Sequence, residues 1–204
     1  KVLQAGKTPV IWDDMLRGFD DSEFELLDKR IAIMCWTYFT RDSGMTQELI
    51  RKFRARGFTV IGASAAKCFE GLDPRYLDLP NFSERLGNIH MWGNAAVKNH
   101  LDGVVTTVWS GSTGTVAPPH PFFDTAWYPV IFSADKYWNT SSNPNVFEDR
   151  FSSNFFGSVS CQGCFDNSHH VMYYSFDRVA ADCARNRYIA EIYRAMVLLS
   201  AYRL

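Results

Sequence analysis

The apolar run Val10-Ile11-Trp12-Asp13-Asp14 decides the fold, because it stops abruptly at two carboxylates. Short apolar runs of this kind are typical of strands buried in a parallel sheet, with polar residues at their carboxyl ends. The same pattern recurs in residues 31–36, 58–64 and 103–109. We therefore expect four buried parallel strands.

Helical patterns separate these runs. Residues 20–27 are amphipathic, and residues 46–56 carry apolar side chains at helical spacing before Gly57, a predicted cap after the helix. Residues 81–100 form the next predicted helix. Alternating strands and helices predict βαβ units, and four such units make the C-terminal half of a (β/α)8 barrel, strands five to eight, within the α/β class. A doubly wound open sheet would give the same alternation, but no glycine-rich phosphate-binding turn opens any of these helices.

The pattern changes after the fourth strand. An aromatic-rich helix is expected from about Pro121, followed by a Ser/Asn-rich loop at 140–145, a short helix at 145–156 and a long amphipathic helix or helix pair at 173–202. We expect residues 1–135 to belong to the half-barrel and residues 136–204 to form a mainly helical extension. The chain starts without Met and stops within a helical pattern, so we interpret it as a fragment.

Composition excludes several partners. The 204 residues are 47% hydrophobic and carry a formal net charge of -1, so no overall field attracts nucleic acid or an anionic membrane. No apolar run approaches the roughly 20 residues that span a bilayer. We expect a soluble protein with a small neutral ligand, in a compartment that the sequence leaves open.

The five cysteines leave their chemistry open. Cys35 and Cys68 lie in apolar stretches, where a buried thiol is the common state. Cys161 and Cys164 form a CxxC that is followed by His169, His170 and Cys183. Zinc and a disulfide are both conceivable there, but the spacing fits no known zinc finger and we favour free thiols.

Tryptophan ends three of the four strands, at Trp12, Trp36 and Trp109. These rings could simply pack in a core, because aromatic residues dominate cores. They could also form the apolar wall of a sugar site, since sugar faces and acetamido methyl groups pack on aromatic rings while a few polar groups fix the hydroxyls. Catalytic residues of barrels lie at the carboxyl ends of strands, which favours the second interpretation.

Polar residues accompany these tryptophans. Asp13 and Asp14 could accept a sugar hydroxyl or cap the next helix, and Tyr38 follows Trp36. Lys67, after the third strand, could contact a hydroxyl or be a solvated surface group. A glycosidase usually needs two carboxyl groups about the scissile bond, and no acid in this chain is placed to be the proton donor.

The ordered set Val10 to Arg17, Trp36-Thr37-Tyr38, Gly62 to Lys67 and Gly103 to Trp109 resembles glycoside hydrolase family 20, in its hexosaminidase D-like branch of β-N-acetylhexosaminidases. The resemblance covers roughly residues 1–135. It implies that Trp12, Trp36 and Trp109 surround the N-acetyl group of the substrate. It also implies a substrate-assisted retaining mechanism in which an Asp–Glu pair on strand four, upstream of Lys1, orients the amide and protonates the leaving oxygen.

These observations predict an enzyme that removes terminal N-acetylglucosamine or N-acetylgalactosamine from glycans, with no cofactor and no catalytic metal. The substrate-binding residues we expect are Trp12, Asp13, Asp14, Trp36, Tyr38, Lys67 and Trp109, and the fragment alone should be inactive. A noncatalytic carbohydrate-binding remnant and a barrel hydrolase for another glycan remain alternatives. If this chain is all that exists, its four βα units leave an open sheet edge, and homo-oligomers are then expected.

Overall fold

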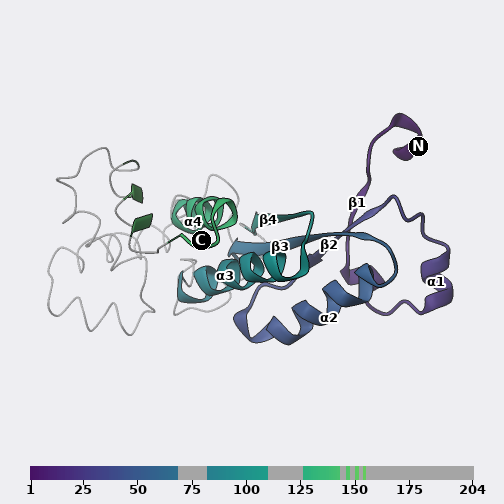
Figure 1. Ribbon diagram of the computed structural model, residues 1–204, viewed down its shortest axis with the longest axis horizontal. Helices are drawn as coiled ribbons and strands as arrows, with labels where there is room; N and C mark the ends of the chain where they lie inside the picture. The colour runs from purple at the N-terminus through teal and green to yellow at the C-terminus, as the bar shows by residue number, and fades with distance from the viewer. Residues whose placement is uncertain (69–81, 110–125, 143–145, 148–149, 152–153, 155–204) are drawn as a thin grey trace, which may run out of the picture. The chain divides into compact units, whose positions relative to one another are not determined.

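The computed structural model describes residues 1–68, 82–109, 126–142, 146–147, 150–151 and 154. The chain forms two compact units, one of residues 1–64 with 87–107, the other of residues 65–86 with 108–204. The strands and α-helices, labelled in Figure 1, are β1 (Val10–Trp12), α1 (Asp21–Glu25), β2 (Ala32–Trp36), α2 (Ser43–Arg54), β3 (Thr59–Lys67), α3 (Phe82–Asn99), β4 (Gly103–Val108) and α4 (Trp127–Trp138). Three short 3-10 helices accompany them in the described residues: η1 (Leu3–Ala5), η2 (Asp14–Leu16) and η3 (Thr40–Asp42).

The four strands form one parallel sheet in the order β1-β2-β3-β4. Val10 pairs with Ala32 across β1 and β2, and Ala32 pairs with Thr59 across β2 and β3. The hydrogen bonds from Asp102 to Val60 and from Trp109 to Lys67 advance together along the chain, which makes β4 parallel to β3. The predicted α/β class and the four parallel strands are thus confirmed.

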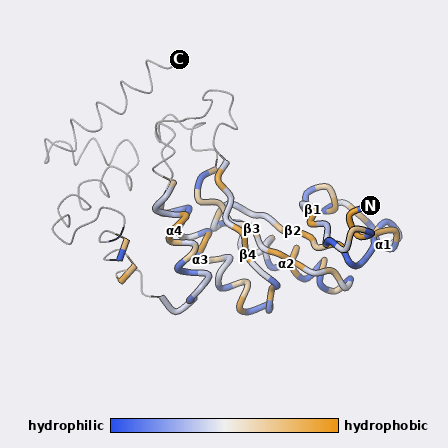
Figure 2. Tube along the Cα trace, turned by 90° about the horizontal axis from the view of Figure 1, so that it is seen from above, coloured by the Kyte–Doolittle hydropathy of each residue, from blue (hydrophilic) through white to orange (hydrophobic). Residues whose placement is uncertain are grey.

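Helix α2 contributes buried apolar side chains to the core of the first unit. Its predicted apolar positions Leu49, Ile50 and Phe53 are all buried, and polar and apolar residues alternate along the helix (Figure 2). Phe53 meets the ring of Phe24 edge-on at 5.9 Å between centroids. Burying a phenylalanine of this kind contributes about 1.5–3 kcal/mol, so these rings fix α1 and α2 together.

The helix ends follow local chemistry. Asp20 caps α1 with a complete capping box, because its side chain accepts from the Glu23 N–H while the Glu23 carboxylate accepts from the Asp20 N–H. Gly57, predicted to follow α2 directly, adopts φ +80° two residues beyond the C-cap Ala55. It turns the chain so that the Phe58 N–H reaches the Phe53 carbonyl at 3.3 Å.

The third strand is longer than predicted. The third strand, expected to end at Ser64, continues as β3 through Ala65, Ala66 and Lys67. All three residues are buried. Small apolar residues such as Ala65 and Ala66 are compatible with a strand, so no clear sign in the sequence marks where this strand ends. In the second unit α4 ends at Trp138, just before the loop predicted at 140–145, and Pro129 lies in its first turn, where a backbone N–H has no helical partner to lose.

The second unit has an aromatic core of its own. Tyr128 and Phe132 of α4 contact Phe147, and Tyr128 also meets Phe151 edge-on at 4.9 Å. Residues 146, 147, 150, 151 and 154 are helical, in agreement with the short helix predicted at 145–156. The predicted helices at 173–202 and the CxxC cysteines lie outside the described residues. Within the described residues, no helix is both long and apolar enough to cross a membrane.

Candidate functional site

The carboxyl ends of β1 and β2 lie side by side in the first unit. The two strands are parallel, with Trp12 opposite Met34, and the N–H of Asp13 continues the ladder by donating to the Met34 carbonyl at 3.1 Å. Trp12 is 38% exposed, whereas Asp13 is fully buried. The two residues therefore differ sharply in what they can offer a ligand.

The Asp13 carboxylate is held by a fork from Arg17. Arg17 Nε donates to Oδ2 at 2.9 Å and Nη2 donates to Oδ1 at 3.2 Å, while the Trp36 N–H donates to Oδ1 at 3.2 Å. The turn of η2 puts Arg17 four residues after Asp13, close enough for both bonds. Arg17 Nη2 also donates to the Trp36 carbonyl at 2.8 Å, so one guanidinium joins the ends of both strands.

Burial raises the pKa of the Asp13 carboxyl above its usual value, because the charged form is desolvated. The hydrogen bonds and charge of Arg17 oppose this rise without cancelling it. Burial, and then the nearby Asp13 charge, also raise the pKa of the Cys35 thiol well above its ordinary range. Cys35 is therefore a protonated, inert thiol at neutral pH, and both Cys35 and Cys68 are buried as predicted.

Two side chains already pack on the Trp36 ring. The Arg17 guanidinium carbon lies 4.6 Å from its centroid, and the Tyr38 ring lies 4.8 Å away at an interplanar angle of 31°. Tyr38 is buried, and Trp36 is only partly exposed. The result is an aromatic and cationic surface at the end of β2, and Trp12, the last residue of the neighbouring strand β1, is more exposed.

Helix α3 fixes the backbone at the end of β2. The Thr37 carbonyl accepts hydrogen bonds from Asn88 Nδ2 and Trp92 Nε1, each at 2.9 Å. The Thr37 hydroxyl pairs with the Thr46 hydroxyl at 2.6 Å. All four residues are buried, so the position of the neighbouring Trp36 and Tyr38 is set by a polar cluster that solvent does not loosen.

The two predicted carboxylates, Asp13 and Asp14, differ in their exposure to solvent. Asp13 occupies the N-cap position of η2 but its side chain makes no capping bond, so the helix-capping alternative is wrong for Asp13. Asp14 is the first residue of η2 and is exposed. Of the two, only Asp14 has a carboxylate that a ligand could reach without rearrangement.

Lys67 and Trp109 belong to the second unit. The Trp109 N–H donates to the Lys67 carbonyl at 3.0 Å, and the indole is 40% exposed. Lys67 is 1% exposed, which contradicts the alternative of a solvated surface lysine. Its place on the buried continuation of β3 explains why.

The structure thus brings together Trp12, Asp13, Trp36 and Tyr38 in the first unit. Arg17, Asn88 and Trp92 were not among the site residues predicted from the sequence. Arg17 could have been found, because an acid followed four residues later by an arginine is a spacing at which side chains meet within one helical turn. The Asn88 and Trp92 contacts span 51 and 55 residues, and no local signal marks them.

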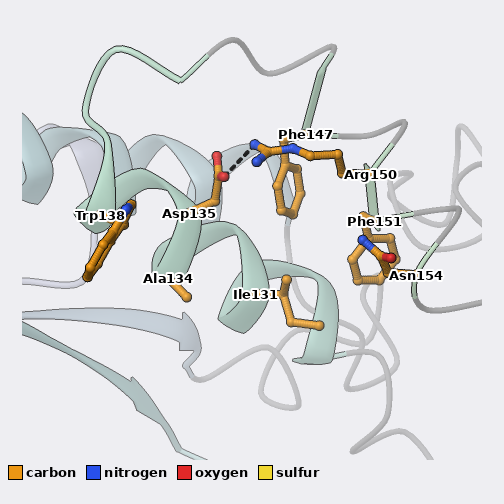
Figure 3. A pocket seen from close by; sticks show the side chains of 8 residues that line it. All are labelled: Ile131, Ala134, Asp135, Trp138, Phe147, Arg150, Phe151 and Asn154. Atoms are coloured by element: carbon orange, nitrogen blue, oxygen red, sulfur yellow. Dashed lines mark hydrogen bonds and ion pairs between the residues drawn. The ribbon is translucent and has the colours of Figure 1, made fainter.

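The second unit contains a separate, mainly apolar pocket of about 500 Å³. Figure 3 shows it between α4 and the residues around Phe147, with the Asp135–Arg150 ion pair on one side. Trp138, at the end of α4, is 93% exposed. The lining residues are Ile131, Ala134, Asp135, Trp138, Phe147, Arg150, Phe151 and Asn154.

The described residues include no cluster of three or more His, Cys, Asp or Glu side chains that could hold a metal ion. The fold and the strand ends define an α/β protein whose parallel strands carry aromatic and charged side chains at their carboxyl ends. Compared with known proteins, the chain matches no protein-family model, no curated protein and no solved structure.

Proposed function

We propose that this chain is part of a β-N-acetylhexosaminidase that resembles glycoside hydrolase family 20 and removes terminal N-acetylglucosamine or N-acetylgalactosamine from glycans. The observation that carries the proposal is the pair of tryptophans, Trp12 and Trp36, at the carboxyl ends of two adjacent parallel strands. Aromatic rings at this edge of a sheet suit the apolar face of a sugar and its acetamido methyl group.

The sheet topology supports the half-barrel that this function requires. Successive strands are neighbours in chain order, with no reversal among the four. A barrel is built by adding βα units in this way, whereas a doubly wound sheet changes direction at a switch point. Barrel enzymes bind their substrates at the carboxyl ends of the strands, and strands end at or just before Trp12 and Trp36 in the first unit and Trp109 in the second.

In the proposed mechanism the substrate acetamido oxygen attacks the anomeric carbon, the glycosidic oxygen leaves with a proton from an enzyme acid, and water then opens the cyclic intermediate with retention. This chain would contribute the wall around the acetamido group. Asp13 is unsuited to be the acid because its carboxylate is fully buried against Arg17. We assign proton donation and amide orientation to an Asp–Glu pair upstream of Lys1.

The test is hydrolysis of a nitrophenyl N-acetyl-β-glucosaminide by a protein that joins this chain to its upstream sequence. Trp12→Ala and Trp109→Ala should each lower kcat/KM at least about tenfold, the scale of losing a well-packed aromatic contact. Trp138→Ala is the matched control, because that indole is almost fully exposed and lies outside the proposed site. Equal activity in all three variants would refute the assigned wall.

The same experiment distinguishes the proposed hydrolase from a noncatalytic carbohydrate-binding protein. This chain alone should bind N-acetylhexosamine without releasing nitrophenol. Turnover by the chain alone would place the acid within these residues and contradict the proposed division of labour. Binding without turnover even when the upstream sequence is present would favour a noncatalytic sugar-binding protein.

A further inference from the structure

Arg17 has N–H donors that no hydrogen bond among the described residues uses. Nε–H and both Nη2 hydrogens serve Asp13 and the Trp36 carbonyl, and these bonds are 2.8–3.2 Å long. In the described part of the chain, no hydrogen bond involves Nη1, which carries two further N–H donors. The side chain is 26% exposed while Asp13 is fully buried. A rigidly held guanidinium thus presents one nitrogen toward solvent.

The location of that nitrogen points to a ligand. The guanidinium packs on Trp36 and joins the carboxyl ends of β1 and β2, and Trp12, the last residue of β1, is partly exposed. The bound carboxylate neutralises the charge of Arg17, so the remaining donors favour a neutral oxygen over a free anion. Hydroxyl groups next to an apolar sugar face supply oxygens of that kind.

We propose that Arg17 donates from Nη1 to a hydroxyl of the bound sugar and that Asp13 is the positioning residue that holds the guanidinium in place. This inference rests on the proposed function and adds to it a residue that selects the sugar. Asp13 acts through Arg17 and does not touch the ligand. Its effect on binding should therefore disappear when Arg17 is already changed.

The experiment measures binding of the methyl β-glycoside of N-acetylglucosamine, and of its 3-, 4- and 6-deoxy analogues, by titration calorimetry. Arg17→Lys keeps the charge but loses the fork. In the unchanged protein one deoxy analogue should bind about tenfold or more weakly than the parent glycoside, the scale of a hydrogen bond to a charged group. Arg17→Lys should bind the parent glycoside and that analogue equally.

Arg56→Lys is the matched control. Arg56 also pairs with an aspartate, Asp21, and its guanidinium lies 5.0 Å from the Phe24 ring centroid, but it follows the end of α2 rather than the end of a strand. This variant should bind all four sugars as the unchanged protein does. Asp13→Asn should weaken binding of the parent glycoside when Arg17 is present. It should have no added effect on binding in Arg17→Lys, and a double-mutant cycle measures this difference.

A second measurement avoids any folding defect in the variants. The guanidinium NMR signals of Arg17 in the unchanged protein should shift on addition of the parent glycoside and not on addition of the critical deoxy analogue. Failure of the unchanged protein to bind N-acetylhexosamine would overturn the proposed function and this inference together. Binding with no Arg17 shift and the same deoxy preference in Arg17→Lys would overturn this inference alone.

Discussion

Gly62 of β3 lies directly against the Trp92 indole of α3, so close that a Cβ at Gly62 would stand 2.5 Å from Cε3 and 2.7 Å from Cζ3. The indole has no room to retreat, because Trp92 is fully buried and its Nε1 donates to the Thr37 carbonyl. The absence of a side chain at Gly62 is therefore a packing requirement at the point where α3 meets the sheet.

Gly62→Ala should destabilise the protein by about 1–3 kcal/mol, the usual cost of overpacking a core. Urea unfolding followed by tryptophan fluorescence measures the change. Gly44→Ala in α2 is the control, since nothing lies within 4 Å of its Cβ position and alanine is the better helix former by about 0.5–1 kcal/mol. Equal stability of Gly62→Ala and the unchanged protein would show that Trp92 does not occupy this position.

Asp13 should give the protein a distinctive pH dependence. Its folded-state pKa is raised above the ordinary 3.8, so the folded state binds the proton more tightly than the unfolded chain does. Its contribution to stability is therefore greatest below about pH 3.8 and declines as the pH rises to the folded pKa. The difference in unfolding free energy between the unchanged protein and Asp13→Asn should fall across this window and then level off.

Urea unfolding of both proteins from about pH 3 to about pH 7 tests this prediction. Subtracting the unfolding free energy of Asp13→Asn from that of the unchanged protein cancels the contributions of carboxyl groups that both proteins contain. Asp20 and Asp28, whose pKa values are lowered by their own hydrogen bonds, are two such groups. A difference that grows with pH would mean that the Arg17 pairing outweighs burial and lowers the pKa of Asp13 in the folded protein.

Asn88→Leu should loosen the end of β2. The substitution conserves volume but removes one of two donors to the buried Thr37 carbonyl, and we expect a loss of about 1–3 kcal/mol. It should also weaken sugar binding if Trp36 and Tyr38 depend on this anchor. Hydrogen exchange of the Tyr38 amide, with Asn99→Leu at the far end of α3 as control, would detect the loosening. Unchanged exchange would show that Trp92 alone holds the carbonyl.

Among the described residues β1 is an edge strand of the sheet, and this edge should promote self-association of the chain. Val10 is 46% exposed, and because the Pro9 carbonyl and the Asp13 N–H point to β2, the backbone of Val10 faces away from it. Val10→Lys should reduce association, since a lysine at an edge opposes strand pairing. Sedimentation velocity across a concentration series measures this. A monomeric unchanged chain at every concentration would refute the prediction.

Much of the fold could be predicted because its signals are local. The apolar runs, the helical spacing of Leu49, Ile50 and Phe53, and the glycine after α2 each lie within a few residues. The continuation of β3 to Lys67 was not predictable, because the burial of a lysine depends on neighbours distant in sequence. The strand-end aromatics were found for the same local reason, whereas the partners that hold them were not.

Asp13 illustrates most clearly what could not be predicted from the sequence. Its position after a strand predicted a carboxylate that either accepts a sugar hydroxyl or caps the next helix, and the sequence alone cannot distinguish these roles from that of a carboxylate bound by a neighbouring arginine. The fork from Arg17 and the bond from the Trp36 N–H decide the matter only in three dimensions. Partners of this kind become visible only when the ends of β1 and β2 are placed next to each other.

The two bonds to the Thr37 carbonyl also bear on the order of folding. The donors, Asn88 and Trp92, lie 51 and 55 positions after Thr37 in the sequence. Forming these hydrogen bonds therefore requires β3 and much of α3 to be in place first. Contacts of such long range form slowly. The end of β2, with Trp36 and Tyr38, should therefore reach its final geometry late, and mutations in α3 that never approach a ligand should delay the appearance of sugar binding during refolding.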